Sequence, residues 1–171
     1  MLMLEKLEYY ITNIHETDPI TLSEQAEILC HELFVFELSH LDIENYAYNP
    51  AAAVEELGLD QELVEQLVED YVEQVTKSVV QFELYLKKLQ DSKAHQEELD
   101  YTPFRELAHK NLGVARNLRI HDAQVLLYEL MKKDDLDYLL TCLEALKYCA
   151  IKLKPKRAYD TLRLMEVKSS L

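Results

Sequence analysis

A histidine in the second half of the chain, His109, has the neighbours that phosphoryl chemistry needs. A neutral imidazole is a good nucleophile at physiological pH and accepts phosphoryl groups. Such a transfer needs an exposed ring, in-line access and nearby cations that offset the charge on the equatorial oxygens. Arg105 and Arg116 stand four residues before and seven residues after His109. In a helix, which advances about 100° per residue, both fall on the face of His109.

Gly113 is the second unusual residue of this stretch, because the chain has only two glycines. A glycine inside a helix costs about 1 kcal/mol relative to alanine. On the face of His109 it removes a side chain where a phosphoryl group and an approaching partner would sit. From the spacing alone, an exposed histidine with incidental arginines on a solvated face explains the same pattern.

The other side of the same helix is expected to face a core. Its apolar stripe consists of Phe104, Leu107, Val114 and Leu118, with Ala108 and Ala115 beside them. Asn111 falls on this stripe, where its amide must find a hydrogen-bond partner or cost about 1–3 kcal/mol. Leu112 is expected to lie bare beside His109, and Lys110 about 100° around the helix from it.

The composition predicts an all-α protein. With 171 residues the chain is long enough for one domain with a buried core. Two glycines and four prolines leave few residues for hairpin turns or phosphate-binding loops. The first residues lack the pattern of a signal peptide and no apolar run approaches about 18 residues, so we expect a soluble protein that does not enter a membrane.

Residues 1–49 are predicted to be an N-terminal helical extension. A short amphipathic helix is expected over residues 2–14, and a second helix after Pro19. The apolar residues of this extension are interpreted first as part of the core. The alternative is a surface that binds a partner or a second copy of the chain, which would make a homo-oligomer. These residues are Phe34, Phe36, Leu38 and Leu41.

Residues 50–154 are predicted to hold an antiparallel four-helix bundle, followed by a tail over 155–171. A helix near 50–57 precedes it and ends at Gly58. The four longer helices begin at Asp60, at Thr102-Pro103, near Asp122 and at Asp134 or Asp135. A polar connector is expected over 91–100, and Pro155 is expected to end the last helix.

Charge is divided unevenly along the chain. Residues 1–100 hold 23 Asp and Glu against 5 Lys and Arg, a balance of −18, whereas residues 101–171 hold 9 acids against 13 bases, a balance of +4. The strongly acidic total of −14 disfavours nucleic-acid binding. The basic half contains His109.

The remaining metal-binding residue types show no ligand spacing. Cys30, Cys142 and Cys149 are expected to be core residues of a protein in the reducing cytoplasm. The other five histidines are His15, His31, His40, His95 and His121. We therefore expect neither a metal nor a cofactor.

The stretch "ELAHKNLGVARNLRIHDAQVLLYEL" (106–130) resembles the phosphoacceptor segment of histidine-containing phosphotransfer (HPt) domains. The pattern of that family is roughly A-H-x-x-K-G followed by small residues. Ala108, His109, Gly113 and Ala115 match it position by position. The stretches on either side are similar too, so that the resemblance covers about residues 50 to 154.

The resemblance implies a phosphoryl carrier and not an enzyme. His109 would pass a phosphoryl group between aspartates of receiver domains, or from a hybrid kinase to a response regulator. Receiver sites are acidic clusters, which the local excess of basic residues complements. The positions expected to face the phosphate or the receiver are Arg105, Lys110, Leu112, Gly113 and Arg116.

One position departs from the family pattern: Leu112 stands where the family has a lysine. The departure concerns phosphate stabilisation and transfer rate, and leaves the nucleophile in place. A second hypothesis is therefore a pseudo-phosphotransfer module that docks on a kinase or response regulator without carrying phosphate, with Leu112 as a docking contact. The retained pair of His109 and Gly113 favours the carrier, because a pure binding module needs neither.

Overall fold

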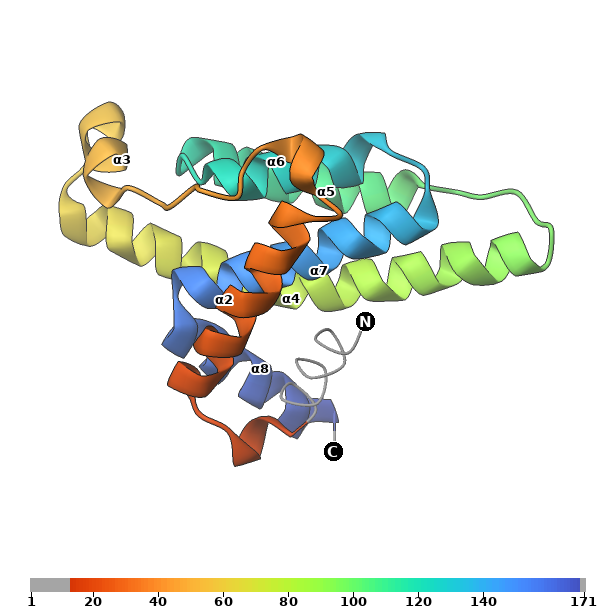
Figure 1. The fold of residues 1–171 in the computed structure, drawn as a ribbon, viewed down its shortest axis with the longest axis horizontal. Coiled ribbons are helices and arrows are strands. Elements are labelled where there is room, and N and C mark those ends of the chain that lie inside the picture. Colours follow the sequence, from red (N-terminus) through yellow and green to blue (C-terminus); the bar gives the residue numbers. More distant parts are fainter. Residues whose placement is uncertain (1–12, 170–171) are drawn as a thin grey trace.

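The computed structural model describes residues 13–169, and this part of the chain folds into seven α-helices and two short 3-10 helices, with no strand (Figure 1). The helix expected over residues 2–14 lies almost wholly outside the described residues. The elements in chain order are η1 (Ile14–Glu16), α2 (Pro19–Val35), η2 (Ser39–Leu41), α3 (Pro50–Leu57), α4 (Gln61–Ala94), α5 (Thr102–Asn117), α6 (His121–Lys132), α7 (Leu136–Leu153) and α8 (Pro155–Ser169).

Local capping chemistry sets most helix ends where the sequence predicts them. Asp60 and Asp135 cap α4 and α7, because their Oδ1 atoms each accept a backbone N–H three residues later at 3.2 Å. Gly58 closes α3 in the left-handed conformation, with φ of 66°. The predicted all-α class is thus confirmed for the described residues.

Two expectations about segment boundaries are wrong. Helix α4 continues to Ala94, so the predicted connector over 91–100 is shorter; no glycine or proline interrupts the helix there. The residues after Pro155, expected as a tail, form helix α8. Proline ends α7 but also suits the first turn of the next helix, where its missing N–H has no intrahelical partner to lose.

The helices share one hydrophobic core. Helix α5 packs on α4 and α6, and α7 packs on the same two helices. Helix α2 crosses α7 at a steep angle, and α8 packs on α4, α7 and α2 (Figure 1). Core residues come from α2 and from α4 through α8, so the N-terminal extension and the C-terminal helix belong to the same packed unit. Of the extension's apolar residues, Phe34 and Leu38 are buried, whereas Phe36 is 70% exposed.

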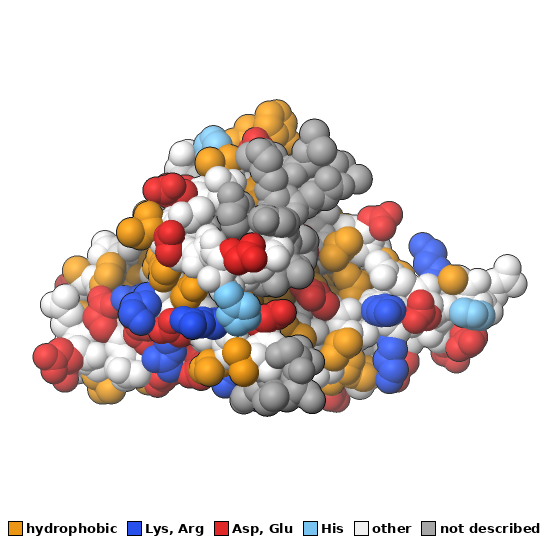
Figure 2. Space-filling model, turned by 90° about the horizontal axis from the view of Figure 1, so that it is seen from below, with side chains coloured by type: hydrophobic (Ala, Val, Ile, Leu, Met, Phe, Trp, Pro, Cys, Tyr) orange, Lys and Arg blue, Asp and Glu red, His pale blue; other side chains and the backbone are white. Residues whose placement is uncertain are grey.

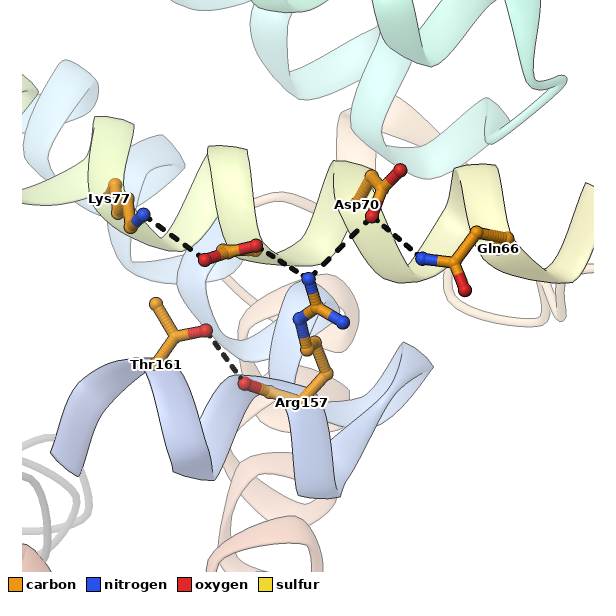
Figure 3. A network of polar contacts seen from close by, with 6 residues as sticks. Gln66, Asp70, Lys77, Arg157 and Thr161 are labelled. Atoms are coloured by element: carbon orange, nitrogen blue, oxygen red, sulfur yellow. Dashed lines mark hydrogen bonds and ion pairs between the residues drawn. The ribbon is translucent and has the colours of Figure 1, made fainter. Parts of the chain in front are cut away.

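An ion-pair network fastens α8 to α4. The guanidinium of Arg157 lies 2.5 Å from Glu73 and 3.6 Å from Asp70. Figure 3 shows Arg157 on α8 reaching up to Asp70 on α4. Lys77 adds a second cation 3.1 Å from Glu73, and the two bases hold the pKa of that carboxyl below its ordinary value. In Figure 2, acidic and basic side chains alternate over this side of the molecule. Exposed pairs of this kind stabilise by about 0–1 kcal/mol each and mainly fix orientation.

Candidate functional site

The candidate site lies on α5, whose start is fixed by the residues just before it. The N-cap residue is Tyr101, whose side chain makes no capping hydrogen bond, whereas the sequence pointed to Thr102 as the capping group. Asp100, one residue earlier, accepts the backbone N–H of Thr102 on its Oδ1 at 3.0 Å. Hydrogen bonds from the backbone and the side chain of Thr102 lower the pKa of the Asp100 carboxyl. Tyr101 is held by a 2.8 Å hydrogen bond from its hydroxyl to the carbonyl of Asp134, which ties the start of α5 to the α6–α7 turn.

The other end of α5 is held by two tyrosines that sequence reasoning did not single out. Tyr48 donates its hydroxyl to the carbonyl of Leu118 at 3.0 Å, and Tyr46 donates to the carbonyl of Arg119 at 3.2 Å. The Tyr46 hydroxyl also accepts the backbone N–H of His121 at 3.1 Å. The connector between η2 and α3 thus pins the α5–α6 turn. Its signal in the sequence is the pair of tyrosines in "NYAYNP".

His109 lies in the middle of α5 with its ring exposed, as the sequence predicts. Among the described residues it makes no hydrogen bond or ion pair. The imidazole is therefore accessible to a partner, and nothing within residues 13–169 occupies its nitrogens.

Three cations lie on α5 within two turns of His109. Arg116 and Lys110 are exposed and Arg105 is half-buried, and within residues 13–169 none of the three forms an ion pair. The guanidinium of Arg105 lies 4.6 Å from the centre of the Tyr101 ring, a cation–π contact, and its Nε is buried without a hydrogen-bond partner in this part of the chain. Arg119 is excluded from the group, because its Nε donates to Glu56 at 2.6 Å.

An open depression of about 460 Å3 adjoins His109 on the side of the helix start. Its lining consists of Thr102, Arg105, Glu106, His109, Lys110 and Met131. Met131 comes from α6 and was not anticipated from the sequence. The imidazole and two of the cations thus share one shallow, open surface, which is large enough to admit a phosphoryl group.

Leu112 does not belong to this surface, and the expectation that it lies bare beside His109 is wrong. Its side chain is 3% exposed and packs in the core. The buried arc of α5 is centred near Ala108 and Ala115, about 100° around the helix from His109. Because α5 packs on both α4 and α6, the arc is wide enough to include Leu112, whereas Leu107 and Val114 are only partly buried.

Gly113 is not required by the internal packing of the protein. A Cβ atom built at this position would meet nothing within 4 Å. The position has ordinary helical geometry, since Gly58 is the glycine with positive φ in the described part of the chain. The space that Gly113 leaves open therefore lies outside the helix, next to His109.

The three cysteines, unlike His109, lie inside the protein. All three cysteines are free and buried, as predicted, with the Sγ atoms of Cys30 and Cys149 3.6 Å apart. Across residues 13–169, no three His, Cys, Asp or Glu side chains are grouped to hold a metal ion. No helix in the same range has the length and apolar character of a membrane span.

Comparisons of the chain with protein-family profiles, curated proteins and solved structures found no match. The arrangement offers an exposed imidazole, cations without ion-pair partners on the same face, and an unobstructed backbone position at Gly113.

Proposed function

We propose that this protein is a phosphoryl carrier of a phosphorelay, with His109 as the phosphoacceptor. The observation that carries the proposal is the exposed imidazole in the middle of α5, on one face with Arg105 and Arg116, which form no ion pair within residues 13–169. A nucleophile beside cations without a carboxylate partner suits transfer of a negatively charged group.

The proposal extends to the fold, in which α4 to α7 would correspond to the antiparallel four-helix bundle of an HPt domain. Its support is that α4, α5, α6 and α7 each pack on two others of the set, and that short turns at 118–120 and 133–135 join the last three. The additional helices α2 and α8 cover α7 and α4. This leaves the exposed face of α5 open for a partner.

On this chain the proposed transfer step uses the His109 ring as its nucleophile. A nitrogen of the neutral His109 ring attacks the phosphorus of an aspartyl phosphate on a receiver domain. The N–P bond forms while the P–O bond to the aspartate breaks, and the carboxylate leaves with the bonding pair. The phosphorylated ring then releases its N–H proton to water, and the reverse sequence delivers the group to a second receiver.

Arginine would take the role that lysine has in the family pattern. The lysine position is Leu112, which is buried and offers nothing to a phosphate. Arg105 and Arg116 flank the imidazole along its own face, and Arg105 also lines the depression beside it. Bidentate guanidinium groups suit the equatorial oxygens of a phosphoryl group.

The proposed partner is a receiver domain with an acidic site. The exposed cations around His109 are Lys110 and Arg116, with Arg105 partly exposed, against the single nearby acid Glu106. Complementary charge of this kind speeds association and weakens with salt.

The test is incubation with phosphorylated receiver domains, followed by intact-mass measurement at neutral or alkaline pH. The wild type should gain one phosphoryl group that is acid-labile and alkali-stable, and His109→Gln should gain none while melting at the same temperature. His31→Gln is the matched control, because His31 is also exposed on a helix but has Glu27 and Glu32 as neighbours. The His31→Gln variant should be phosphorylated to the same extent as the wild type.

A different outcome would identify the binding module instead. If no receiver phosphorylates the wild type, yet one binds the wild type and His109→Gln with equal affinity, the carrier proposal is wrong. The exposed surface of α5 would then serve docking alone.

A further inference from the structure

A second cavity, of about 540 Å3, lies away from His109 and shares no lining residue with the depression there. One wall is the connector over residues 44–50, and the others come from α2, α4, α6 and α7. The connector runs from η2 to α3 in Figure 1. Cavities of this size commonly bind small organic molecules.

A buried tyrosine on α4 belongs to the cavity lining. Tyr71 on α4 lines it and is 3% exposed, and its hydroxyl has no hydrogen-bond partner within residues 13–169. Burial raises the pKa of this hydroxyl well above its ordinary value, and the nearby Asp122 and Cys149 raise it further. The hydroxyl therefore stays protonated at neutral pH, and no residue within 13–169 takes up its hydrogen-bonding capacity.

Asp122, near Tyr71, supplies a carboxylate to the same cavity. Its Oδ1 accepts the backbone N–H of Ala123 at 2.7 Å. Burial raises the pKa of Asp122, against the opposing effects of that amide, the Cys149 thiol and the charge of Lys152. A cationic group in the cavity would stabilise the charged form of Asp122, which loses hydration on burial.

The charge balance of the lining is negative. Four carboxyl groups line the cavity, from Glu27, Glu44, Glu65 and Asp122, against the two ammonium groups of Lys152 and Lys154. Lys154 donates to Glu65, so this pair is neutral. Three acids and one lysine remain, and they favour a positively charged ligand over an anion.

Aromatic rings complete the lining. Phe34, Tyr46, Tyr48 and Tyr71 all border the cavity. The hydroxyls of Tyr46 and Tyr48 are committed to the carbonyls of the α5–α6 turn, so both rings are held in place. Aromatic rings together with carboxylates are the usual means by which proteins hold organic ammonium groups.

We propose that this cavity binds a small organic cation: a primary ammonium group on Asp122 and Tyr71, with an apolar body against Phe34 and Ile120. The ammonium donates to the carboxylate of Asp122 and to the oxygen of Tyr71. The proposal does not depend on phosphotransfer, because the cavity and His109 are separate.

The test uses the full chain and three ligands of one shape: benzylammonium, benzyl alcohol and benzoate. Backbone amide shifts in NMR titrations give the affinities and the location. Benzylammonium should bind saturably and shift the amides of residues 44–49 and 120–123, with an affinity at least about tenfold above that of benzyl alcohol, and benzoate should not bind. Equal binding of benzyl alcohol or benzoate would overturn the proposal. Phenethylammonium and butylammonium are tested in the same way, and the absence of saturable binding by all three ammonium compounds would also overturn it.

Variants locate the ammonium group. Asp122→Asn and Tyr71→Phe keep the shape of each side chain, and each should weaken benzylammonium binding by about tenfold or more. Glu98→Gln and Tyr85→Phe are the matched controls, an exposed acid in the α4–α5 connector and a second tyrosine on α4, and should bind like the wild type. His109→Gln should also bind unchanged. Wild-type affinity in Asp122→Asn would show that the carboxylate does not hold the ligand.

Discussion

The side-chain amide of Asn111 on α5 donates to the hydroxyl of Ser78 on α4 at 3.1 Å, inside the core. The same Nδ2 group also donates to the carbonyl of Leu107 at 3.0 Å. The Oδ1 atom of Asn111 is buried and has no partner among residues 13–169. The amide thus joins two helices, as its place on the core stripe predicts, and leaves one acceptor unsatisfied.

Replacement of Asn111 by leucine should leave the free energy of unfolding unchanged or raise it by up to about 1 kcal/mol. The substitution removes an unsatisfied buried acceptor, which costs about 1–3 kcal/mol, together with hydrogen bonds of similar total value. Urea denaturation of Asn111→Leu measures the change. Ser78→Ala is the companion variant and should lose less than about 1 kcal/mol, because the bond to Leu107 remains. A loss above about 2 kcal/mol in Asn111→Leu would contradict the face assignment.

Leu112→Lys should destabilise the protein by about 3 kcal/mol or more, because it places a charge in the core without a partner. It should therefore not add a cation beside His109, although lysine stands at this position in the HPt pattern. Asn117→Lys adds the same charge at an exposed position of α5 and should change stability by less than about 0.5 kcal/mol. Thermal melting of both variants makes the comparison, and a Leu112→Lys protein as stable as the wild type would place Leu112 on the surface.

Gly113→Ala should raise stability and slow phosphoryl transfer. The added methyl group meets nothing within 4 Å, so the helix gains about 0.5–1 kcal/mol from alanine. The same methyl group narrows the approach to His109. Asn117→Ala is the control, since it improves helix propensity at an exposed site and should leave the rate unchanged. If Gly113→Ala transfers phosphate as fast as the wild type, the open space at Gly113 is not needed for a partner to reach His109.

Asp122 should make stability depend on pH. Its pKa is raised above the ordinary value of 3.8 by burial, so the folded state binds the proton more tightly than the unfolded state. The resulting stability is fully present below 3.8 and is lost as pH rises through the folded-state pKa. Asp122→Asn should lack this decline. Denaturation of both proteins at a series of pH values tests it, and parallel stability curves would show that the carboxyl is not desolvated.

Much of the fold follows from the sequence because its signals are local. Asp60, Gly58 and Asp135 set helix ends through hydrogen bonds or backbone angles within a few residues. The exposure of His109 and the burial of Asn111 likewise follow from helical periodicity. Such features depend on residues that are neighbours in the chain.

The tertiary structure decided what depends on distant segments. Leu112 is buried because two helices, α4 and α6, pack on α5. Helical periodicity predicts the direction of the buried face of α5 but not how many degrees of the helix that face covers. The contacts of Tyr46 and Tyr48 with the α5–α6 turn join residues about 70 positions apart, and Cys30 meets Cys149 across 119. Sequence alone predicted that His109 lies on the surface. Packing between helices determined which cations share that surface and where the second cavity lies.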